Sequence, residues 1–581
     1  MNTILFLVMR RMRLPLMVLL TTYTVAIVGM TLVPGVDNDG QPIPMDFFHA
    51  FYFVSYTATT IGFGEIPYAF SDAQRMWVIF SLYMTVVAWF YAIGTLLTLV
   101  QDELLRKAFI ESRFVRTVNN IHEPFYLICG YGDTGSALVS ALEERFLRTV
   151  VIEIRQERID TLTMENYPVY VPKLCADASK PNCLVEGGLN NPHCAAVVAL
   201  TNDNLANLHV AITAKLLKPD LTVIGRVDSH EVAANMESFG TNYIINPFEI
   251  FASKLHTALR SPNLLLLREC LTGELEMVSC EPLIPPHQGL WILCGYGRFG
   301  KAVYERLKEE RNIHLVIIEA DPNTTGYPRG ECIVGRGTEA DTLRQAHVEE
   351  AVGIVVGTND DVNNLSIVMT ARELNPKLFI VLRQNKADNQ IIFEAAKADI
   401  VMQPSKIIAN HIRVLLTTPL LVDFMRLSKQ RGNDWINHLI SRLKKILNET
   451  SPTIWQLKID PETAPAICEA LSQGNLIQLK CLVRDPRNRT KNLAGVPLLL
   501  VRNTEKILLP DESENLAVGD QLLWCGKPAT AGWMTWTLRD PFVLIYLATG
   551  QAMPRSYLWR WLQQRFGNQL SASSKFKTKV L

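Results

Sequence analysis

Two long apolar stretches, with a short aromatic run between them, dominate the first hundred residues. Residues 14–33 carry no charge and are numerous enough to cross a hydrocarbon core of roughly 30 Å. Residues 76–100 form a second uncharged stretch, whereas the aromatic run at 46–56 is too short to span. Irregular backbone at membrane depth must be covered by protein or water. The pattern therefore predicts two spanning helices with a re-entrant pore helix between them.

The charges beside these stretches give them a direction. Arg10, Arg11 and Arg13 precede the first span. Because positive charge is retained in the cytoplasm, the N-terminus and everything after the second span are predicted to be cytoplasmic. A cleaved signal peptide is the alternative, but the apolar run is long for one and no clear small-residue cleavage site follows it. Residues 34–44 are rich in Pro and Gly and are expected to form an external loop, after which Asp46 is a candidate N-cap.

The segment after the aromatic run has glycines at alternate positions. Glycine permits φ > 0, and alternating permissive positions can turn successive carbonyl groups toward one side. Rings of such carbonyls replace the hydration shell of an ion. One chain offers one such segment, so a closed ring of copies is required. The predicted filter comprises Thr60, Ile61, Gly62, Phe63, Gly64 and Glu65, and the ion ligands are the carbonyls of the first four with the Thr60 hydroxyl.

Beyond residue 100 the pattern becomes that of a soluble protein. Residues 101–120 are charged with helical spacing and are expected to transmit force from the second span, or to serve as a passive linker. Apolar strands then alternate with helical patterns, and this arrangement occurs twice. Residues 125–135 match 290–300, and residues 195–203 match 352–360. The repeat predicts two parallel, doubly wound sheets.

Each repeat carries a glycine fingerprint between its first strand and the helix that follows. An acidic residue ends the next strand in both, Glu153 in the first and Glu319 in the second. The glycines make a tight turn and admit a phosphate to the helix N-terminus, while the carboxylate accepts ribose hydroxyls. That carboxylate disfavours a 2′-phosphate, so NAD or an ADP-like adenine nucleotide is the predicted ligand. The loop residues of the first unit are Gly130, Tyr131, Gly132, Asp133, Thr134 and Gly135.

The second unit carries the same fingerprint with larger side chains inside it. Its candidate nucleotide residues are Gly295, Gly297, Arg298, Gly300, Glu319 and Arg383. Arg298 can pair with a phosphate or stand exposed at the start of a helix. Arg226 and Arg383 follow matching strands, where they can reach phosphates or lie at an interface. A fold that keeps the loop but has an empty or altered pocket is the alternative for both units.

Composition narrows the classes of function. A chain of 581 residues is too long for one domain, and 48% hydrophobic residues fit a mostly soluble protein with a small membrane part. The formal net charge is +0, which gives no general basic field for nucleic acid. The 11 cysteines contain no C-x-x-C pair, and reduced, buried thiols in a cytosolic region are expected. The sequence leaves the existence of a metal site unknown.

Residues 57–65 resemble the selectivity filter of potassium channels, usually T-x-G-Y-G-D, and residues 123–527 resemble RCK domains, related to Trk-type nucleotide-binding subunits. The resemblance implies a K⁺-conducting homotetramer in the cell (inner) membrane with eight RCK units in a gating ring. It implies nucleotides, calcium (Ca²⁺) or both as effectors, although no contiguous loop supplies calcium ligands. It also places Asp177-Ala178, the Thr201-Asn202-Asp203 turn and Arg226 near the nucleotide, while Ala176 replaces the glycine typical before that aspartate.

Three departures from the channel pattern bear on selectivity and gating. Phe63 replaces the usual Tyr, which removes a hydroxyl that often braces the filter, and Glu65 replaces the usual Asp. The hinge glycine often found some twenty residues after the filter is missing. Gly94 is the only glycine of the second span and is either a hinge or a site of close helix packing. A less selective monovalent cation channel with the same gating is therefore an alternative.

The predicted fold is an α-helical membrane pore joined to tandem α/β Rossmann-like RCK domains with an α+β C-terminal subdomain. The expected divisions are the pore at 1–100, a helical linker at 101–122, the first Rossmann domain at 123–271, a linker at 272–289, the second Rossmann domain with crossover helices at 290–448, the RCK C-terminal subdomain at 449–528 and an extension at 529–581. Within the extension, residues 533–566 are expected to dock on the ring, with a membrane-surface helix as the alternative.

These expectations combine into a ligand-gated potassium channel that is not an enzyme. A membrane-anchored NAD-dependent oxidoreductase is the main alternative of another class. Neither unit is followed by an evident substrate domain with a His or Lys acid–base site, and an enzyme has no need of a filter. A regulatory subunit of a separate transporter is a further alternative, but such subunits lack a pore of their own.

Overall fold

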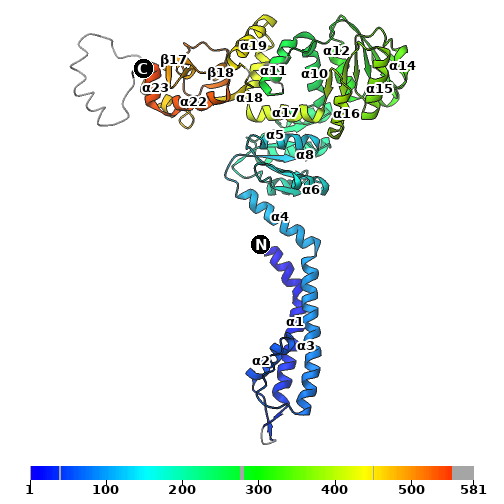
Figure 1. Cartoon of the computed structure of the whole chain (residues 1–581), viewed down its shortest axis with the longest axis vertical. Helices are drawn as coiled ribbons and strands as arrows, with labels where there is room; N and C mark the ends of the chain where they lie inside the picture. The colour runs from blue at the N-terminus through cyan, green and yellow to red at the C-terminus, as the bar shows by residue number, and fades with distance from the viewer. Residues whose placement is uncertain (1, 38–40, 275–280, 449, 552–581) are drawn as a thin grey trace, which may run out of the picture. The chain divides into compact units, whose positions relative to one another are not determined.

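The computed structural model describes residues 2–37, 41–274, 281–448 and 450–551 (Figure 1). The chain divides into two compact units. The first consists of residues 1–122 with the short segments 172–174 and 186–188, and we call it the pore unit. The second consists of the remaining residues from 123 onward, and we call it the soluble unit.

Two long helices lie side by side in the pore unit, α1 (Asn2–Leu32) and α3 (Asp72–Val100) (Figure 1). Met9–Leu32 and Asp72–Leu99 are long and apolar enough to cross a membrane, as predicted. Between them in the chain come the short strands β1 (Gly35–Val36) and β2 (Pro42–Ile43), followed by α2 (Phe47–Ala58). Two spans and a short helix in the re-entrant position are the elements that the apolar pattern predicts.

The short helix α2 is anchored at its start and along one face. The Asp46 carboxylate accepts a hydrogen bond from the backbone N–H of His49 at 3.0 Å, which is the predicted N-cap. Phe53 and Tyr56 of α2 are buried against Met30 of α1. The chain leaves α3 through α4 (Glu103–Asn119), an amphipathic helix where the charged helical pattern predicts one.

The soluble unit begins with a six-stranded sheet in the order β5-β4-β3-β6-β7-β8. Its paired strands run parallel, and the central strand has Leu127 and Ile128 fully buried on its opposite faces. The strands are β3 (Phe125–Cys129), β4 (Arg148–Glu153), β5 (Lys173–Cys175), β6 (Cys194–Ala199), β7 (Thr222–Arg226) and β8 (Tyr243–Ile245). The helices after them are α5 (Asp133–Glu143), α6 (Gln156–Met164), α7 (Pro181–Glu186), α8 (Asn204–Leu217) and α9 (His230–Ser238).

A second six-stranded sheet repeats this topology in the order β11-β10-β9-β12-β13-β14, again with parallel pairs. Its strands are β9 (Gly289–Cys294), β10 (Ile313–Glu319), β11 (Glu331–Val334), β12 (Gly353–Val356), β13 (Phe379–Arg383) and β14 (Ile400–Met402). Its helices are α12 (Arg298–Leu307), α13 (Pro322–Thr325), α14 (Ala340–Gln345), α15 (Asp361–Leu374), the 3₁₀ turn η1 (Ala387–Asn389) and α16 (Gln390–Ala395). The internal repeat thus gives two doubly wound sheets.

The two sheets exchange the helices that follow their last strands. Helix α10 (Pro247–Arg260) follows the first sheet, yet its Phe251 is buried in the core of the second beside Phe299. Helix α17 (Pro404–Thr417) follows the second sheet, yet its Ile412 is buried in the core of the first with Leu138. The apolar pattern predicts both helices but does not indicate which sheet each one covers.

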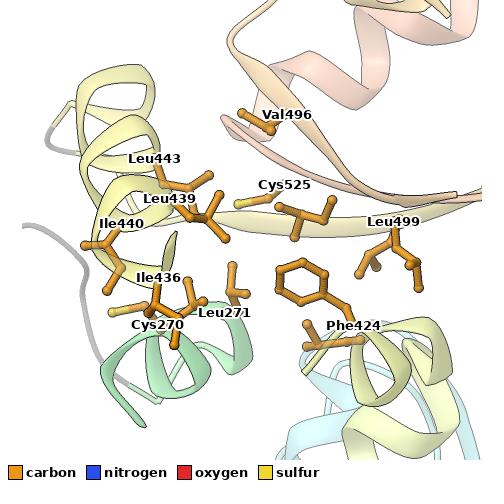
Figure 2. Packing of buried hydrophobic residues seen from close by; sticks show 14 of the residues in the cluster. Cys270, Leu271, Phe424, Ile436, Leu439, Ile440, Leu443, Val496, Leu499 and Cys525 are labelled. Atoms are coloured by element: carbon orange, nitrogen blue, oxygen red, sulfur yellow. The ribbon is translucent and has the colours of Figure 1, made fainter. Parts of the chain in front are cut away.

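A third core joins parts of both repeats to the C-terminal region (Figure 2). Leu271 of α11 (Pro262–Thr272) faces Ile436 of α19 (Asn433–Leu447), while Phe424 of α18 (Pro419–Ser428) lies toward Leu499 of β18. An antiparallel sheet in the order β15-β20-β18-β19 closes this core. Its strands are β15 (Thr453–Lys458), β18 (Gly495–Arg502), β19 (Glu505–Leu508) and β20 (Gln521–Gly526), accompanied by α20 (Pro465–Ser472), α21 (Lys480–Val483) and the pair β16 (Arg484–Asp485) and β17 (Asn488–Asn492). The predicted α+β subdomain is present.

Helices α17 and α18 together also meet the length and composition expected of a membrane span, with a bend of 106° between them. Their apolar side chains are already covered by protein, since Ile412 and Phe424 are both fully buried. Ile412 belongs to the core of the first sheet and Phe424 to the core shared with the C-terminal sheet. We therefore assign this bent pair to the soluble unit.

Two helices of the C-terminal extension pack on the C-terminal subdomain, α22 (Pro528–Arg539) and α23 (Pro541–Thr549). Leu544 of α23 is buried in the subdomain core. Nε of Arg489 donates to the Leu547 carbonyl at 2.9 Å, and the Arg487 guanidinium lies 3.9 Å from the centre of the Trp533 ring. The part of the extension up to residue 551 therefore packs on the C-terminal subdomain of its own chain, docking on the ring stays a prediction, and residues 552–566 of that prediction lie outside the described part.

Candidate filter and nucleotide site

The filter segment has the alternating backbone that its glycine spacing predicts. Thr60, Gly62 and Gly64 all have positive φ, at 63°, 63° and 75°. Thr60 is the unusual member, because a residue with a branched Cβ rarely adopts that conformation. The chain turns sharply out of α2 to reach it, with the Ile61 N–H donating to the Tyr56 carbonyl at 3.0 Å. Alternation at every second residue is the geometry that turns the intervening carbonyls in a common direction.

Two tyrosines of α2 hold the end of this segment. The Tyr56 hydroxyl donates to the backbone carbonyl of Glu65 at 2.7 Å, and the Tyr52 hydroxyl donates to Oε2 of the same glutamate at 3.1 Å. The Phe63 ring meets the Tyr56 ring edge-on at 5.9 Å. Hydroxyls of the pore helix thus hold the end of a segment in which Phe63 offers none, a contact that was not predicted from the sequence. The sequence feature that could have indicated this contact is the spacing of four between Tyr52 and Tyr56, which places both on one face of the helix before the filter.

Gly94 lies in the second half of α3, and Asp102 lies just beyond its end. A Cβ built on Gly94 meets nothing within 4 Å, so close packing against a helix of its own chain does not explain this glycine. Beyond the end of α3, the Asp102 carboxylate forms an ion pair with the Arg11 guanidinium of α1. Asp102 is only 15% exposed and precedes α4 directly. This pair connects the start of the linker helix α4 to the first spanning helix, α1.

The first glycine loop has no room for side chains where the fingerprint places glycines. Gly130 has a φ of 105°, and a Cβ there would lie 2.9 Å from the Thr201 backbone nitrogen. A Cβ on Gly135 would lie 2.1 Å from the Gly130 carbonyl oxygen. Gly132 is the N-cap of α5 and supplies no side-chain capping bond, which leaves the first-turn N–H groups of that helix available to an anion.

Glu153 holds the loop and the adjoining turn together. The side chain is 4% exposed, and its Oε2 accepts the Tyr131 N–H at 2.6 Å. Its Oε1 accepts the Arg155 N–H at 2.9 Å. Each carboxylate oxygen retains one lone-pair direction, so acceptance of a ribose hydroxyl is compatible with these two bonds. The structure adds a bracing function to the sugar-binding one proposed for this residue.

Of the remaining predicted residues, Asp177 follows β5 and Arg226 ends β7 of the same sheet. Asp177 accepts hydrogen bonds from the N–H and hydroxyl of Ser179 at 2.9 and 2.7 Å, and these bonds lower the pKa of its carboxyl group. Nη1 of Arg226 donates to Oδ1 of Asn202 at 3.0 Å, and burial lowers the pKa of its guanidinium. Arg226 is not among the residues that line the cavity described next.

A cavity of about 390 Å³ opens at the ends of β3, β4, β5 and β6. It is lined by the predicted Gly130, Gly132, Glu153 and Asp177, so the fingerprint and the residue from the third strand meet in one space. The Thr201-Asn202-Asp203 turn, which the family resemblance places near the nucleotide, also lines it. Other lining residues were not predicted, namely Arg155, Arg158, Ser179 and His209. The two arginines follow Glu153 in the chain, and their absence from the second repeat was the signal available in the sequence. Asp133 and Thr134 belong to the helix side of the loop, where Thr134 is buried.

The second glycine loop repeats the backbone of the first. Oε2 of Glu319 accepts the Tyr296 N–H at 2.5 Å, and Oε1 accepts the Asp321 N–H at 3.0 Å. Gly295 has a φ of 95°, and a Cβ on Gly300 would lie 2.0 Å from the Gly295 carbonyl oxygen. The two loops therefore have the same hydrogen-bonding scheme, and they differ in the side chains around them.

Both arginines of the second unit contact the exchanged helix α10. Nη1 of Arg298 pairs with Asp228, which follows β7 of the first sheet. The Arg383 guanidinium lies 5.1 Å from the Phe248 ring and 5.5 Å from the Phe299 ring, and burial lowers its pKa to about 10. Interface contacts are thus present for Arg298 and Arg383. Gly297 lies open, with nothing within 4 Å of a Cβ built there.

The acidic and thiol groups of the described part form no metal centre. Among the residues described, no group of three or more His, Cys, Asp or Glu side chains is arranged to hold a metal ion. Cys129, Cys294 and Cys525 are buried thiols, and burial raises the pKa of Cys294 to about 12. Such thiols are inert packing residues, as their apolar sequence settings predict.

Two family descriptions match separate parts of the chain. One, described as an ion channel, matches residues 16–102, and the other, described as a TrkA-N domain, matches residues 126–247 and 291–404. The chain joins an ion-channel domain to two TrkA-N domains. This is the architecture of a two-span potassium channel with tandem RCK domains, the family that the filter and the repeat resemble.

Curated relatives match parts of this chain. Potassium channel protein 1 of Methanocaldococcus jannaschii is 33% identical over 140 residues, which is 23% of this chain and 42% of the relative. The TrkA homologue of the Trk potassium uptake system of Pyrococcus abyssi is 32% identical over 137 residues, 22% of this chain and 60% of the relative. Over the first three curated relatives, this chain spans only 30 to 42% of their length.

Solved structures of the GsuK channel are among those to which this chain is similar. The GsuK channel bound to NAD is 16% identical, with 93% of this chain and 99% of that chain covered and a TM-score of 0.46. GsuK bound to ADP is 20% identical, with 71% and 99% covered and a TM-score of 0.44. At this identity the likeness concerns the fold.

Proposed function

We propose that this protein is a ligand-gated potassium channel. The observation that carries the proposal is the filter backbone, with positive φ at Thr60, Gly62 and Gly64 between a pore helix and the second of two spanning helices. Copies of that segment arranged around an axis supply rings of carbonyl ligands from Thr60 to Phe63. A homotetramer is the assembly that fits a single filter segment per chain, and lipid surrounds it.

Gating in this proposal comes from the two TrkA-N domains on the cytoplasmic side, which form an eight-unit ring in the tetramer. An adenine nucleotide such as NAD or ADP binds the cavity beside Gly132 in the first unit, and the second unit is a weaker candidate. A bound ligand shifts the pore only by its difference in affinity between the two ring shapes. The linker helix α4 transmits the change, with Gly94 as the bending point of α3. Calcium is a further effector of this class, at a location not assigned to particular residues.

The division of the chain into domains is part of the same proposal. The pore ends near residue 100, the two Rossmann domains occupy 123–271 and 290–448, and the C-terminal subdomain occupies 449–528. Because each Rossmann domain contributes a helix to the core of the other, the two domains are separate along the sequence and in their sheets but share their cores. The contribution of α10 to the second core means that neither range is expected to fold alone.

Potassium flux from liposomes that hold the purified protein tests the proposal. Flux is expected to change on addition of NAD, ADP or Ca²⁺ to the side of the soluble unit, and the absence of flux under every condition contradicts the channel. Reversal potentials under opposed K⁺ and Na⁺ gradients separate a selective channel from a general cation channel, the alternative raised by Phe63 and Glu65. Sustained reduction of NAD with candidate substrates would instead favour the oxidoreductase.

A further inference from the structure

The guanidinium group of Arg158 lies directly over Gly132, the glycine before α5 in the first cavity. A Cβ built on Gly132 would lie 2.6 Å from Nη1 and 3.5 Å from Nη2 of Arg158. Gly132 caps α5 without a side-chain bond, so the start of this helix has open N–H donors. Arg158 stands at the third position of α6, lines the cavity and is 28% exposed. An anion at the start of α5 would therefore lie between backbone donors and a guanidinium.

The carboxylates that line this cavity accept N–H or hydroxyl groups of the chain, and Glu153 also forms a long ion pair with Arg158. Glu153 is the acid nearest to Arg158, but the Nη1–Oε2 distance is 3.9 Å, and both of its oxygens accept backbone N–H groups. Asp177 is bonded to Ser179, and Asp203 accepts the Leu205 N–H at 2.8 Å. Arg158 lines the cavity, so its guanidinium is within reach of a phosphate bound there. A fork of N–H groups is well matched to two phosphate oxygens.

The second repeat is an internal comparison that lacks this group. Thr324 stands where Arg158 stands in the first repeat, counted from the acidic residue that ends the strand. Its hydroxyl donates to Oδ2 of Asp321 at 2.6 Å, within its own turn. A Cβ on Gly297, the counterpart of Gly132, meets nothing within 4 Å. The same backbone loop is therefore covered by a cation in one unit and open in the other.

We propose that Arg158 determines phosphate specificity in the first unit, by closing over a nucleotide diphosphate held at the start of α5. This inference rests on the proposed nucleotide regulation and deepens it. The ligand class is a nucleoside carrying two or more linked phosphates, with a nucleoside alone bound weakly. The second unit, with Thr324 in this position, discriminates less between a nucleoside and its diphosphate.

Calorimetric titration of the purified full-length protein with adenosine and with ADP tests this specificity. In Arg158→Gln the Kd for ADP is expected to rise about 10- to 100-fold, because charge-assisted hydrogen bonds to the phosphates are lost. The Kd for adenosine is expected to stay within about threefold of wild type, since no phosphate is involved. Arg158→Lys keeps the charge but loses the fork and is expected to recover part of the ADP affinity.

Arg344→Gln is the matched control, because Arg344 is a half-exposed arginine on α14 that pairs with Asp341. It is expected to bind both ligands as wild type does, and all variants are expected to unfold at the same temperature. Equal weakening of adenosine and ADP in Arg158→Gln would mean that Arg158 shapes the pocket rather than binding phosphate, which overturns the inference. Unchanged ADP affinity overturns it as well. A wild-type protein that binds neither ligand would overturn the proposed nucleotide regulation together with the role of Arg158.

Discussion

The hydroxyl of Tyr56 lies 2.7 Å from the backbone carbonyl oxygen of Glu65 and donates a hydrogen bond to it. The donor belongs to the pore helix and the acceptor to the residue after the filter glycines. This bond fixes the outer end of the filter segment to α2 by a contact within one chain. Phe63 carries no hydroxyl of its own, so this bond comes from the pore helix.

We expect Tyr56→Phe to weaken the conducting form of the filter. Loss of one hydrogen bond of about 0.5–1.5 kcal/mol predicts a two- to tenfold fall in the population of that form. Single-channel recording in K⁺ would show it as shorter openings, and reversal potentials would show a loss of preference for K⁺ over Na⁺. Tyr83→Phe, which removes an exposed hydroxyl from α3, is the control and is expected to change neither quantity. Wild-type openings in Tyr56→Phe would show that the bond does not support conduction.

The ion pair between Arg11 and Asp102 is expected to set the balance between open and closed pore. Exposed and partly exposed pairs contribute about 0.2–1 kcal/mol, so Arg11→Gln should change the open-to-closed ratio by up to about fivefold. Asp102→Asn should change it in the same direction, and the exchange Arg11→Asp with Asp102→Arg should restore part of it. Open probability in planar bilayers is the measurement. Additive effects of the two single variants in the double variant would argue against a direct pair.

Gly135→Ala is expected to disrupt the first nucleotide loop through a backbone clash. The added methyl would lie 2.1 Å from the Gly130 carbonyl oxygen, so α5 has to move away from β3. Overpacking of this kind costs about 1–3 kcal/mol, which thermal unfolding of the purified protein would detect as a lower midpoint. ADP affinity should fall as well. Gly532→Ala, within helix α22 and with open space around it, is the control and should be neutral or slightly stabilising.

His411 of α17 is expected to make the soluble unit less stable in mild acid. Burial lowers its pKa to about 4, whereas an unfolded histidine titrates near about 6.5. Between these values the unfolded chain binds the proton and the folded chain does not, so stability is complete above about pH 6.5 and is lost as the pH falls toward 4. The loss amounts to about 3 kcal/mol at most.

Unfolding midpoints measured from pH 8 to pH 4.5 check the role of His411. His411→Asn should flatten the pH dependence. His438→Asn, at an exposed position of α19, should leave the dependence as it is in wild type. Equal slopes for wild type and His411→Asn would show that other groups carry the acid sensitivity.

The backbone conformations of the filter and of the two glycine loops could be predicted from the sequence, because glycines mark conformations that other residues avoid. The spacing at Gly62 and Gly64 predicted the filter backbone, and the fingerprint at Gly130 and Gly295 predicted both loops. Contacts between side chains that are distant in the sequence could not be predicted in the same way. The bond from Tyr52 to Glu65 depends on which face of α2 turns toward the filter, and amphipathic spacing in an all-apolar helix leaves that face undetermined.

Arg158 and the helix exchange were missed for different physical reasons. Arg158 stands on a helix whose charged residues read as a solvated face, and only its position over Gly132 gives it a further meaning. Helices α10 and α17 have well-marked apolar faces, but an apolar face does not specify which of two similar sheets it covers. The two sheets present nearly the same surface, so the choice is made by the lengths of the connections and the fit of particular side chains, such as Phe251 against Phe299.

The exchange of α10 and α17 has a consequence for folding cooperativity. Each sheet is covered by a helix that belongs, along the chain, to the other repeat, so melting one sheet exposes apolar surface on both. The pair of repeats should therefore melt in a single transition. A nucleotide that binds only the first repeat would raise the melting temperature of the second by the same amount. A change that destabilises one repeat is therefore expected to destabilise the other, although their glycine loops share no residue.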